Sequence, residues 1–293
     1  MLISFVFPLT FVILWASAFA TGSVATQDAT PFAALGFRFF LVALGFFIVA
    51  GCLAEFRRVE KRGLKHSVIT GLLFHGLYLG GCWYSFSVGV PAGVSALIVC
   101  THPILTAIFG GILLGEDVSL KNWVGLGLGS VGAALVLGLD FQAEFALDGL
   151  VANVIALVAI TAGTIWQRKY SSTLPLATNN GVQAAAAALF HACVMWFLET
   201  PSIEFTLTFG LAMGWQIVAV SFGAFTILMY LINHNSASHT SALFFLVPPV
   251  AALLGWVLLD EGLTPTDLAG FAVASSGVYL ATRRSTGASD GRR

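Results

Sequence analysis

Residues 103–132 read PILTAIFGGILLGEDVSLKNWVGLGLGSVG, and residues 248–277 read PPVAALLGWVLLDEGLTPTDLAGFAVASSG. Both stretches begin with proline and then place a glutamate before two glycines at the same intervals. The matching pairs are Glu116 and Glu261, Gly125 and Gly270, and Gly132 and Gly277. Further pairs lie upstream at almost the same offset, namely Tyr84 and Tyr230, and Ser95-Ala96-Leu97 and Ser241-Ala242-Leu243. The chain is therefore an internal duplication, and its fold has to be explained as two related halves.

The composition places both halves in a membrane. The chain has 293 residues, of which 58% are hydrophobic and only 9% are charged. Because soluble domains carry roughly 25% charged residues, so few charges cannot form a water-facing shell, and most of the surface must face lipid. The net charge of −1 gives no reason to expect a nucleic-acid partner. We expect an all-α membrane protein embedded in a lipid bilayer.

Ten apolar stretches are long enough to cross a bilayer. A span needs about 20 residues, and it must be helical because lipid cannot satisfy backbone polar groups. The predicted spans are 3–22, 32–53, 67–88, 92–113, 122–138, 148–168, 177–198, 210–232, 239–259 and 265–283. The break between the third and fourth spans rests on Gly89, Pro91 and Gly93. No Lys or Arg precedes Arg38, so the first stretch is interpreted as a retained helix rather than a signal peptide.

The basic residues support this threading. Of the 13 Lys and Arg residues, all but Arg38 fall on one side of the membrane. They are Arg57, Arg58, Lys61, Arg62, Lys65, Lys121, Arg168, Lys169, Arg283, Arg284, Arg292 and Arg293. Because cytoplasmic loops carry the excess of Lys and Arg, we expect that side and both chain termini to be cytoplasmic. The predicted location is the inner membrane of a bacterial cell.

Each predicted half contains five helices, and this odd number turns the second half over in the membrane. We expect a first repeat at 1–141, an inverted second repeat at 142–284, and a disordered cytoplasmic tail at 285–293. Inverted repeats are typical of secondary transporters, because two similar halves that exchange conformations give two states of similar energy, one open to each side. A duplication without mechanistic use is the alternative interpretation.

The repeated motifs resemble those of the EamA-type drug/metabolite transporter superfamily over nearly the whole chain. In the first half they are Trp15, Pro31, Arg38-Phe39, Pro103, Leu114-Gly115-Glu116, Gly125 and Gly132. In the second half they are Pro248, Leu259-Asp260-Glu261, Gly270 and Gly277-Val278-Tyr279. Among the members, the chain looks most like the aromatic amino-acid exporter branch. The resemblance implies a ten-helix fold and the export of metabolites.

Polar residues inside spans are costly and mark candidate sites. Arg38 is expected to contact a substrate carboxylate or, alternatively, helix-end carbonyls. His75, near the middle of the third span, shares a helical face with Tyr78 and Cys82, and we expect this face to turn inward. In the alternative interpretation, a neighbouring helix supplies the hydrogen-bond partner of His75.

No Asp or Glu lies near mid-membrane in this threading, which disfavours antiport of cationic drugs. A histidine is the remaining candidate for a proton carrier.

Aromatic side chains complete the predicted substrate site. Trp15 lies mid-membrane rather than in the interfacial belt, so we expect its indole N–H to find a partner in a cavity wall. Trp166 fits either the belt or a vestibule, while Tyr84 and its mate Tyr230 are interpreted as symmetric gates. The predicted substrate-binding residues are Trp15, His75, Tyr78, Tyr84, His102, Trp166 and Tyr230.

Prolines near helix centres are the predicted hinges. Pro103, Pro248 and Pro249 each remove a backbone hydrogen bond. His102 also has a structural interpretation, in which either it or Thr101 satisfies the carbonyl that Pro103 frees.

Other repeated residues are expected to be structural. Glu116 and Glu261 close turns, and His191 is expected to make a helix–helix contact. Small residues on the fifth and tenth spans form faces for close helix packing. These are Gly125, Gly129, Gly270, Ala274 and Gly277.

The preferred hypothesis is a secondary transporter working by alternating access. We expect a central, aromatic-lined cavity between the halves, bordered by spans one, three, four, six, eight and nine. Because its lining is nearly uncharged, the substrate should be neutral or zwitterionic with an apolar body, such as an aromatic or hydrophobic amino acid. Export of other amphipathic metabolites or drugs is the alternative on the same fold.

Other classes fit the sequence less well. A sugar-nucleotide carrier should bury several Lys or Arg residues, and only Arg38 qualifies. An intramembrane enzyme would need a nucleophile and base, and no GxSxG or HExxH motif occurs. The four cysteines have no metal-binding or disulfide spacing, so we expect no metal and no cofactor. The sequence leaves the oligomeric state open, with a monomer as the working interpretation.

Overall fold

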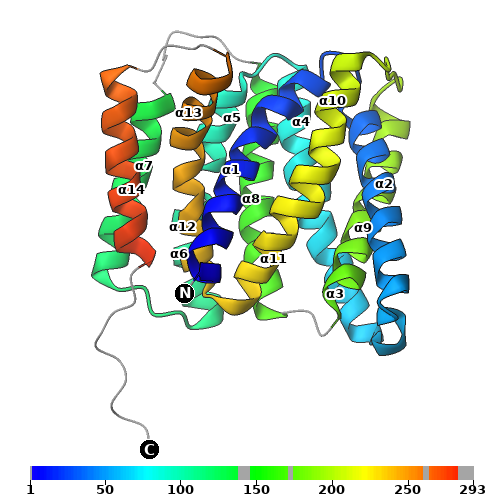
Figure 1. The fold of residues 1–293 in the computed structure, drawn as a ribbon, viewed down its shortest axis with the longest axis horizontal. Helices are drawn as coiled ribbons and strands as arrows, with labels where there is room; N and C mark the ends of the chain where they lie inside the picture. The colour runs from blue at the N-terminus through cyan, green and yellow to red at the C-terminus, as the bar shows by residue number, and fades with distance from the viewer. Residues whose placement is uncertain (1, 138–145, 171–173, 260–263, 283–293) are drawn as a thin grey trace, which may run out of the picture.

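The computed structural model describes residues 2–137, 146–170, 174–259 and 264–282. The regular elements of these residues are helices (Figure 1). The first half contains α1 (Leu2–Ala25), α2 (Pro31–Cys52), η1 (Glu55–Arg58), α3 (Lys61–Gly71), η2 (Leu72–Tyr78), α4 (Leu79–Ser87), α5 (Ala92–Val99), α6 (His102–Leu114) and α7 (Leu120–Leu137). The second half contains α8 (Leu147–Lys169), α9 (Leu176–Leu198), α10 (Leu207–Trp215), η3 (Gln216–Ala224), α11 (Phe225–His234), α12 (Ala237–Ala242), η4 (Leu243–Leu246), α13 (Val247–Leu259) and α14 (Pro265–Thr282).

Several of these elements join end to end into longer rods. The π-helices η2 and η3 continue α3 into α4 and α10 into α11, and the 3-10 helix η4 continues α12 into α13. Six helices among the described residues are long and apolar enough to cross a membrane. They are Val6–Ala25, Pro31–Cys52, Val94–Leu114, Leu147–Lys169, Leu176–Leu198 and Leu207–His234. The structure is therefore an all-helical membrane-type bundle, and ten crossings stay a prediction.

The helix ends follow the turn signals in the sequence closely. The expected break between the third and fourth spans is confirmed, because α4 ends at Ser87, Gly89 has a positive φ of 89° and α5 begins after Pro91. The third helix differs from expectation because it begins at Lys61 rather than at 67. Its extra turn is polar and extends the rod beyond the apolar stretch.

Equivalent helices of the two halves run antiparallel. Glu55, just after α2, accepts hydrogen bonds from the backbone N and Oγ1 of Thr178 in the first turn of α9, at 2.8 and 2.9 Å. At the other end, Glu199 just after α9 accepts one from the backbone N of Ala33 in the first turn of α2, at 2.6 Å. Early α7 likewise meets late α14, where the Asn122 amide donates to the carbonyl of Ala281. This arrangement is that of an inverted repeat.

The described basic turns gather at one end of the bundle. The first turn of α3, the first turn of α7 and the last turn of α8 lie at the lower end in Figure 1, where α1 begins and α14 ends. At this end Arg168 lies 3.9 Å from Glu116 and donates to the carbonyl of Asn233. The predicted boundary near 141, the predicted tail at 285–293 and Glu261 lie outside the described residues.

The small residues pack as the sequence indicated, and Glu116 has a structural role. A Cβ added to Gly125 would meet the backbone of Gly277 and Ala281, and one added to Gly132 would meet that of Ala274. The expected close packing of these faces is therefore confirmed, between α7 and α14. Glu116 is also structural, because its carboxylate accepts hydrogen bonds from backbone amides in the first turn of α12.

Candidate functional site: a cavity at two matching π-helices

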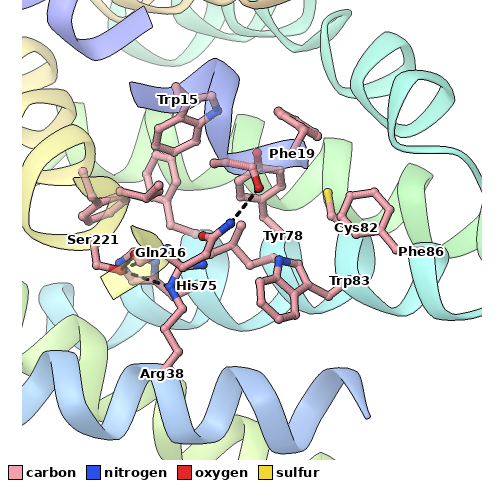
Figure 2. Close-up of a pocket in the computed structure, with 15 residues that line it drawn as sticks. Trp15, Phe19, Arg38, His75, Tyr78, Cys82, Trp83, Phe86, Gln216 and Ser221 are labelled. Atoms are coloured by element: carbon pink, nitrogen blue, oxygen red, sulfur yellow. Dashed lines mark hydrogen bonds between the residues drawn. The ribbon is translucent and has the colours of Figure 1, made fainter. Parts of the chain in front are cut away.

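An apolar cavity with a polar cluster lies among helices of both halves (Figure 2). The cavity has a volume of about 30 Å³, which is enough for water but not for an amino acid. None of the described residues that line it is acidic. They are Trp15, Ala18 and Phe19 of α1; Arg38 of α2; Phe74, His75 and Tyr78 of η2; Leu79, Cys82, Trp83 and Phe86 of α4; Gln216, Val220 and Ser221 of η3; and Phe225 of α11.

The cavity lies closer to the α2 side of the bundle than the sequence predicted. The expected border of spans one, three, four, six, eight and nine is wrong in part, because α2 contributes Arg38 and the described residues of α5, α6, α8, α12 and α13 contribute none of the lining. Spans one, three and eight line it as expected. The rotation of each helix about its own axis decides this, and the apolar patterning of the spans does not specify that rotation.

Arg38 is the charged group of this cavity. Its side chain is 2% exposed, and its Nε and Nη2 atoms donate to the hydroxyl of Ser221 at 3.1 and 3.0 Å (Figure 2). Its guanidinium carbon lies 5.2 Å from the centre of the Phe39 ring. The expected alternative of helix-end carbonyl partners is wrong among the described residues, where Arg38 also has no carboxylate within ion-pair distance. A buried charge without a counter-ion is costly.

The two π-helices occupy matching positions in the two repeats, and both line the cavity. A π-helix has one residue more in each hydrogen-bonded turn than an α-helix, which changes the backbone carbonyls that are hydrogen-bonded within the helix. In η2 the carbonyl of His75 accepts from Nε2 of His191 at 2.9 Å. In η3 the carbonyl of Gln216 accepts from Oγ of Ser221 at 3.0 Å. The third and eighth spans are therefore helical as expected but contain π-helical segments, which the sequence did not indicate. The helix–helix contact expected of His191 is confirmed.

The inward face predicted for the third span is present. His75, Tyr78 and Cys82 are all buried and line the cavity. The ring of Tyr78 stacks parallel to that of Trp15, with 6.4 Å between their centres. His75 packs against the ring of Phe225 at 4.0 Å. The structure thus brings four predicted residues, Trp15, Arg38, His75 and Tyr78, into one cavity, while their part in substrate binding stays a prediction.

Several polar atoms around the cavity are buried without a hydrogen-bond partner of normal geometry. They are Nε1 of Trp15, Nδ1 of His75 and Oε1 of Gln216. Most buried polar groups in proteins are hydrogen-bonded. The unpaired atoms beside the cavity are therefore available to a polar ligand.

Gln216 and Ser221 were missed by the sequence analysis. Both lie in the apolar stretch that forms the eighth span, at 1% and 2% exposure. Their signal was the one that singled out Arg38, since a polar residue in an apolar span requires a partner. Their pairing with α2 depends on the contact between α2 and η3, which the sequence does not display.

The two tyrosines expected as gates lie outside this cavity. Tyr84 donates to the Asp148 carboxylate at 2.8 Å and lines a separate, more open pocket near the start of α2. Tyr230 meets the ring of Phe7 edge-on at 5.3 Å and stacks on that of His234 at 4.0 Å. The gating interpretation stays a prediction.

His102 and Trp166 also lie apart from the cavity. His102 is fully buried and packs edge-on against Phe244 at 4.6 Å, while both of its ring nitrogens lack a partner. Thr101, rather than His102, bonds a carbonyl one turn back, that of Ile98 at 2.7 Å. Trp166 lines a surface groove between α6 and α8.

The predicted hinge prolines coincide with interruptions in the helices. Pro103 lies in the first turn of α6, directly after the short break that ends α5. Pro248 and Pro249 lie in the first turn of α13, directly after the 3-10 turn η4. The two breaks occupy matching places in the repeats. Bending at these breaks during function stays a prediction.

Known proteins share the sequence pattern and the architecture. A solved crystal structure described only as "Crystal structure of protein" superposes with a TM-score of 0.75 at 19% identity, over 94% of this chain and 95% of that one; this likeness concerns the fold alone. "Uncharacterized transporter YvbV" of Bacillus subtilis is 25% identical over 94% of this chain and 90% of its own length. "Uncharacterized inner membrane transporter YedA" of Escherichia coli strain K12 is 25% identical over 92% and 87%.

One relative carries a substrate in its name. "Probable terminal-alkyne amino-acid exporter" of Streptantibioticus cattleyicolor is 28% identical over 94% of this chain and 92% of its own length. The model of the EamA-like transporter family matches twice, at residues 2–138 and 148–283, which are the two repeats found in the sequence. Because these two matches cover nearly all of the chain, it belongs to the EamA-like transporter family of multi-pass membrane transporters.

Proposed function

We propose that this protein exports small zwitterionic metabolites with apolar side chains, in particular aromatic or other hydrophobic amino acids. The observation that carries the proposal is the buried guanidinium of Arg38, which has no carboxylate partner among the described residues and borders a cavity walled by aromatic rings. A substrate carboxylate supplies the missing counter-ion. The rings of Trp15, Tyr78 and Trp83 supply an apolar surface for the side chain.

The mechanism proposed is alternating access. The cavity is too small for an amino acid in this state, so the substrate enters when the halves move apart on one side. Pro103, Pro248 and Pro249 are the proposed hinges, since each lies at a helix interruption. Tyr84 on α4 and Tyr230 on α11 are the proposed gates, because these two helices end at opposite ends of the bundle (Figure 1). Trp166 stays a proposed contact for a more open state, whereas for His102 we propose the packing role against Phe244 that it has here.

The membrane arrangement is part of the proposal. We propose ten crossings as two inverted five-helix repeats, with both termini in the cytoplasm of a bacterial cell and the protein in its inner membrane. The clustering of basic turns at one end of the bundle supports this orientation. The amino-acid exporter name of one relative supports the substrate class.

Transport in proteoliposomes tests the proposed function. Vesicles containing the purified protein are loaded with radiolabelled phenylalanine, tryptophan, leucine, lysine or glutamate, and efflux is compared with that of protein-free vesicles. We expect accelerated efflux of the first three and no acceleration for lysine or glutamate, whose charged side chains would be buried among apolar rings. Efflux at the protein-free rate for all five would remove the substrate claim.

A further inference from the structure

The side-chain amide of Gln216 is held in one orientation. Its Nε2 atom donates to the carbonyl of Ala18 at 2.7 Å and to Oγ1 of Thr21 at 2.8 Å, both on α1. Because a carbonyl can only accept, the nitrogen must face Ala18 and the amide cannot be flipped. Both amide hydrogens are then used. Oε1 of Gln216 is left as an acceptor with a fixed direction.

This acceptor is buried and unpaired at the cavity. Gln216 is 1% exposed, and its Oε1 has no hydrogen-bond partner. Gly22 leaves room for the Trp83 ring beside the amide, since a Cβ there would lie 3.1 Å from Nε1 of Trp83. An orphaned acceptor in such a place loses the free energy of hydration without replacement. A donor from a bound molecule would restore it.

Ser221 ties this acceptor to the cationic group of the cavity. Its hydroxyl accepts from Arg38 and donates to the backbone carbonyl of Gln216 at 3.0 Å. Arg38 and Gln216 therefore lie at the same end of the cavity, as Figure 2 shows. Among the described residues Nη1 of Arg38 makes no hydrogen bond, so the guanidinium keeps donors for a carboxylate.

We propose that Gln216 Oε1 accepts the ammonium group of the substrate while Arg38 binds its carboxylate, so that the cavity selects α-amino acids over amines and carboxylic acids with the same side chain. The inference rests on the proposed function and adds the residue that recognises the amino group. A neutral amide suits this role beside Arg38, because it can bind an ammonium without forming an ion pair that neutralises the guanidinium.

The test uses three compounds with the same aromatic ring. Phenylalanine carries both charged groups, phenylpropionate lacks the amine and phenylethylamine lacks the carboxylate. Each competes with radiolabelled phenylalanine for exchange in proteoliposomes. In the wild type we expect phenylalanine to compete at least 10-fold better than either analogue, the effect of losing one charge-assisted hydrogen bond. Equal competition by phenylalanine and phenylpropionate would overturn the inference without any variant.

Two variants locate the effect at Gln216. In Gln216→Met we expect phenylalanine to compete about 10-fold less well while phenylpropionate is unchanged, so that the preference between them disappears. A loss shared equally by both compounds indicates a packing role and overturns the inference. If the Gln216→Met variant does not fold, Gln216→Glu replaces it in the test. Its added negative charge should make phenylethylamine a better competitor than in the wild type. No gain by the amine overturns the inference for that variant.

Gln183 provides a matched control and separates the two proposals. It is a fully buried glutamine on α9 whose Oε1 also lacks a partner, but it does not line the cavity. Gln183→Met should keep the wild-type preference for phenylalanine over phenylpropionate. If the wild-type protein exchanges no phenylalanine, the proposed function fails together with the inference. If it exchanges phenylalanine and phenylpropionate alike, the inference fails alone.

Discussion

Two pairs of equivalent helices cross between the repeats, and they are joined in different ways. In the pair α7 and α14 the backbones touch, because added Cβ atoms at Gly125, Gly132 and Gly277 would each meet backbone atoms of the other helix. The pair α2 and α9 instead packs through side chains, as where Phe46 and Phe47 of α2 meet Gly181 of α9, and it is capped at both ends, by Glu55 on α9 and by Glu199 on α2. The pairs lie on opposite sides of the bundle (Figure 1).

The difference assigns each side a mechanical role. Two helices whose backbones are in direct contact have a single close-packed arrangement. Separating them loses the dispersion contacts of that arrangement all at once. A carboxylate cap can break at one face while the cap at the other face stays intact. Arg38 on α2 also borders the cavity, whereas the described residues of α7 and α14 do not. We therefore expect α7 and α14 to form the static part and α2 and α9 the moving part.

The largest effect is expected where the backbones touch. Gly132→Val places side-chain atoms against the backbone of Ala274, and neither helix can yield without separating from the other. Overpacking of this kind typically costs about 1–3 kcal/mol, with more against rigid backbone. We expect a steep fall in the yield of monodisperse protein and in its melting temperature, measured by size-exclusion chromatography and thermal unfolding in detergent.

Gly127→Val is the control for this prediction. Gly127 lies on the same helix, and a Cβ there meets nothing within 4 Å. It makes the same change in helix propensity, which favours valine over glycine, without the collision. Equal losses of stability in the two variants would break the distinction between the two pairs.

Arg38→Gln should give the opposite pattern, with a loss of transport and little loss of stability. The charge has no carboxylate partner among the described residues, so removing it relieves a desolvation cost, and a glutamine can still bond Ser221. Losing a charge-assisted bond to substrate, about 1.5–3 kcal/mol, lowers phenylalanine transport at least 10-fold. Efflux and melting temperature are measured on the same preparation. A large fall in melting temperature would mean that Arg38 is structural.

Most of the fold could be predicted because membrane spans follow simple rules. About 20 apolar residues make a crossing, and Gly89 and Pro91 mark a break that the structure contains. The contacts of Gly125 and Gly277 followed from the small-residue pattern. The π-helices could not be predicted, since no proline or glycine pattern encodes them. They depend on which residues of η2 and η3 meet neighbouring helices.

The site was predicted in part for a related reason. Arg38, His75 and Trp15 are visible as polar or amphipathic residues in apolar spans, and all of them line the cavity. His102 has the same signal and lies elsewhere, because the rotation of α6 about its axis aims it at Phe244. Gln216 carries the same signal and was overlooked. Its unpaired Oε1, which makes it a candidate for substrate recognition, is visible only after the helices have been packed.

The end caps should give a moderate effect confined to the moving pair. Glu199→Ala removes the acceptor at the first turn of α2, and loss of a helix cap costs about 0.5–2 kcal/mol. We expect faster amide hydrogen exchange at Phe32 and Ala33, no change in α7 and α14, and a transport rate altered a few-fold. Glu55→Ala should act in the same way at the first turn of α9.

Glu204→Ala is the matched control for the caps. This exposed glutamate follows α9 on the same face as Glu199, and its carboxylate has no hydrogen bond within the described part of the chain. Its exchange pattern should equal that of the wild type. Faster exchange in α14 of the Glu199→Ala variant would contradict independent motion of the two pairs.

The smallest effect is expected from His102→Phe. Both ring nitrogens of His102 are buried without partners, and a phenylalanine can keep the edge-on packing against Phe244 while removing two unsatisfied polar atoms. We expect a melting temperature that is equal to or slightly above that of the wild type, and a phenylalanine efflux rate within about two-fold. Thermal unfolding and efflux are measured together. A strong loss of transport at unchanged stability would return His102 to the substrate path, which the structure can accommodate only if α6 rotates toward the cavity in another state.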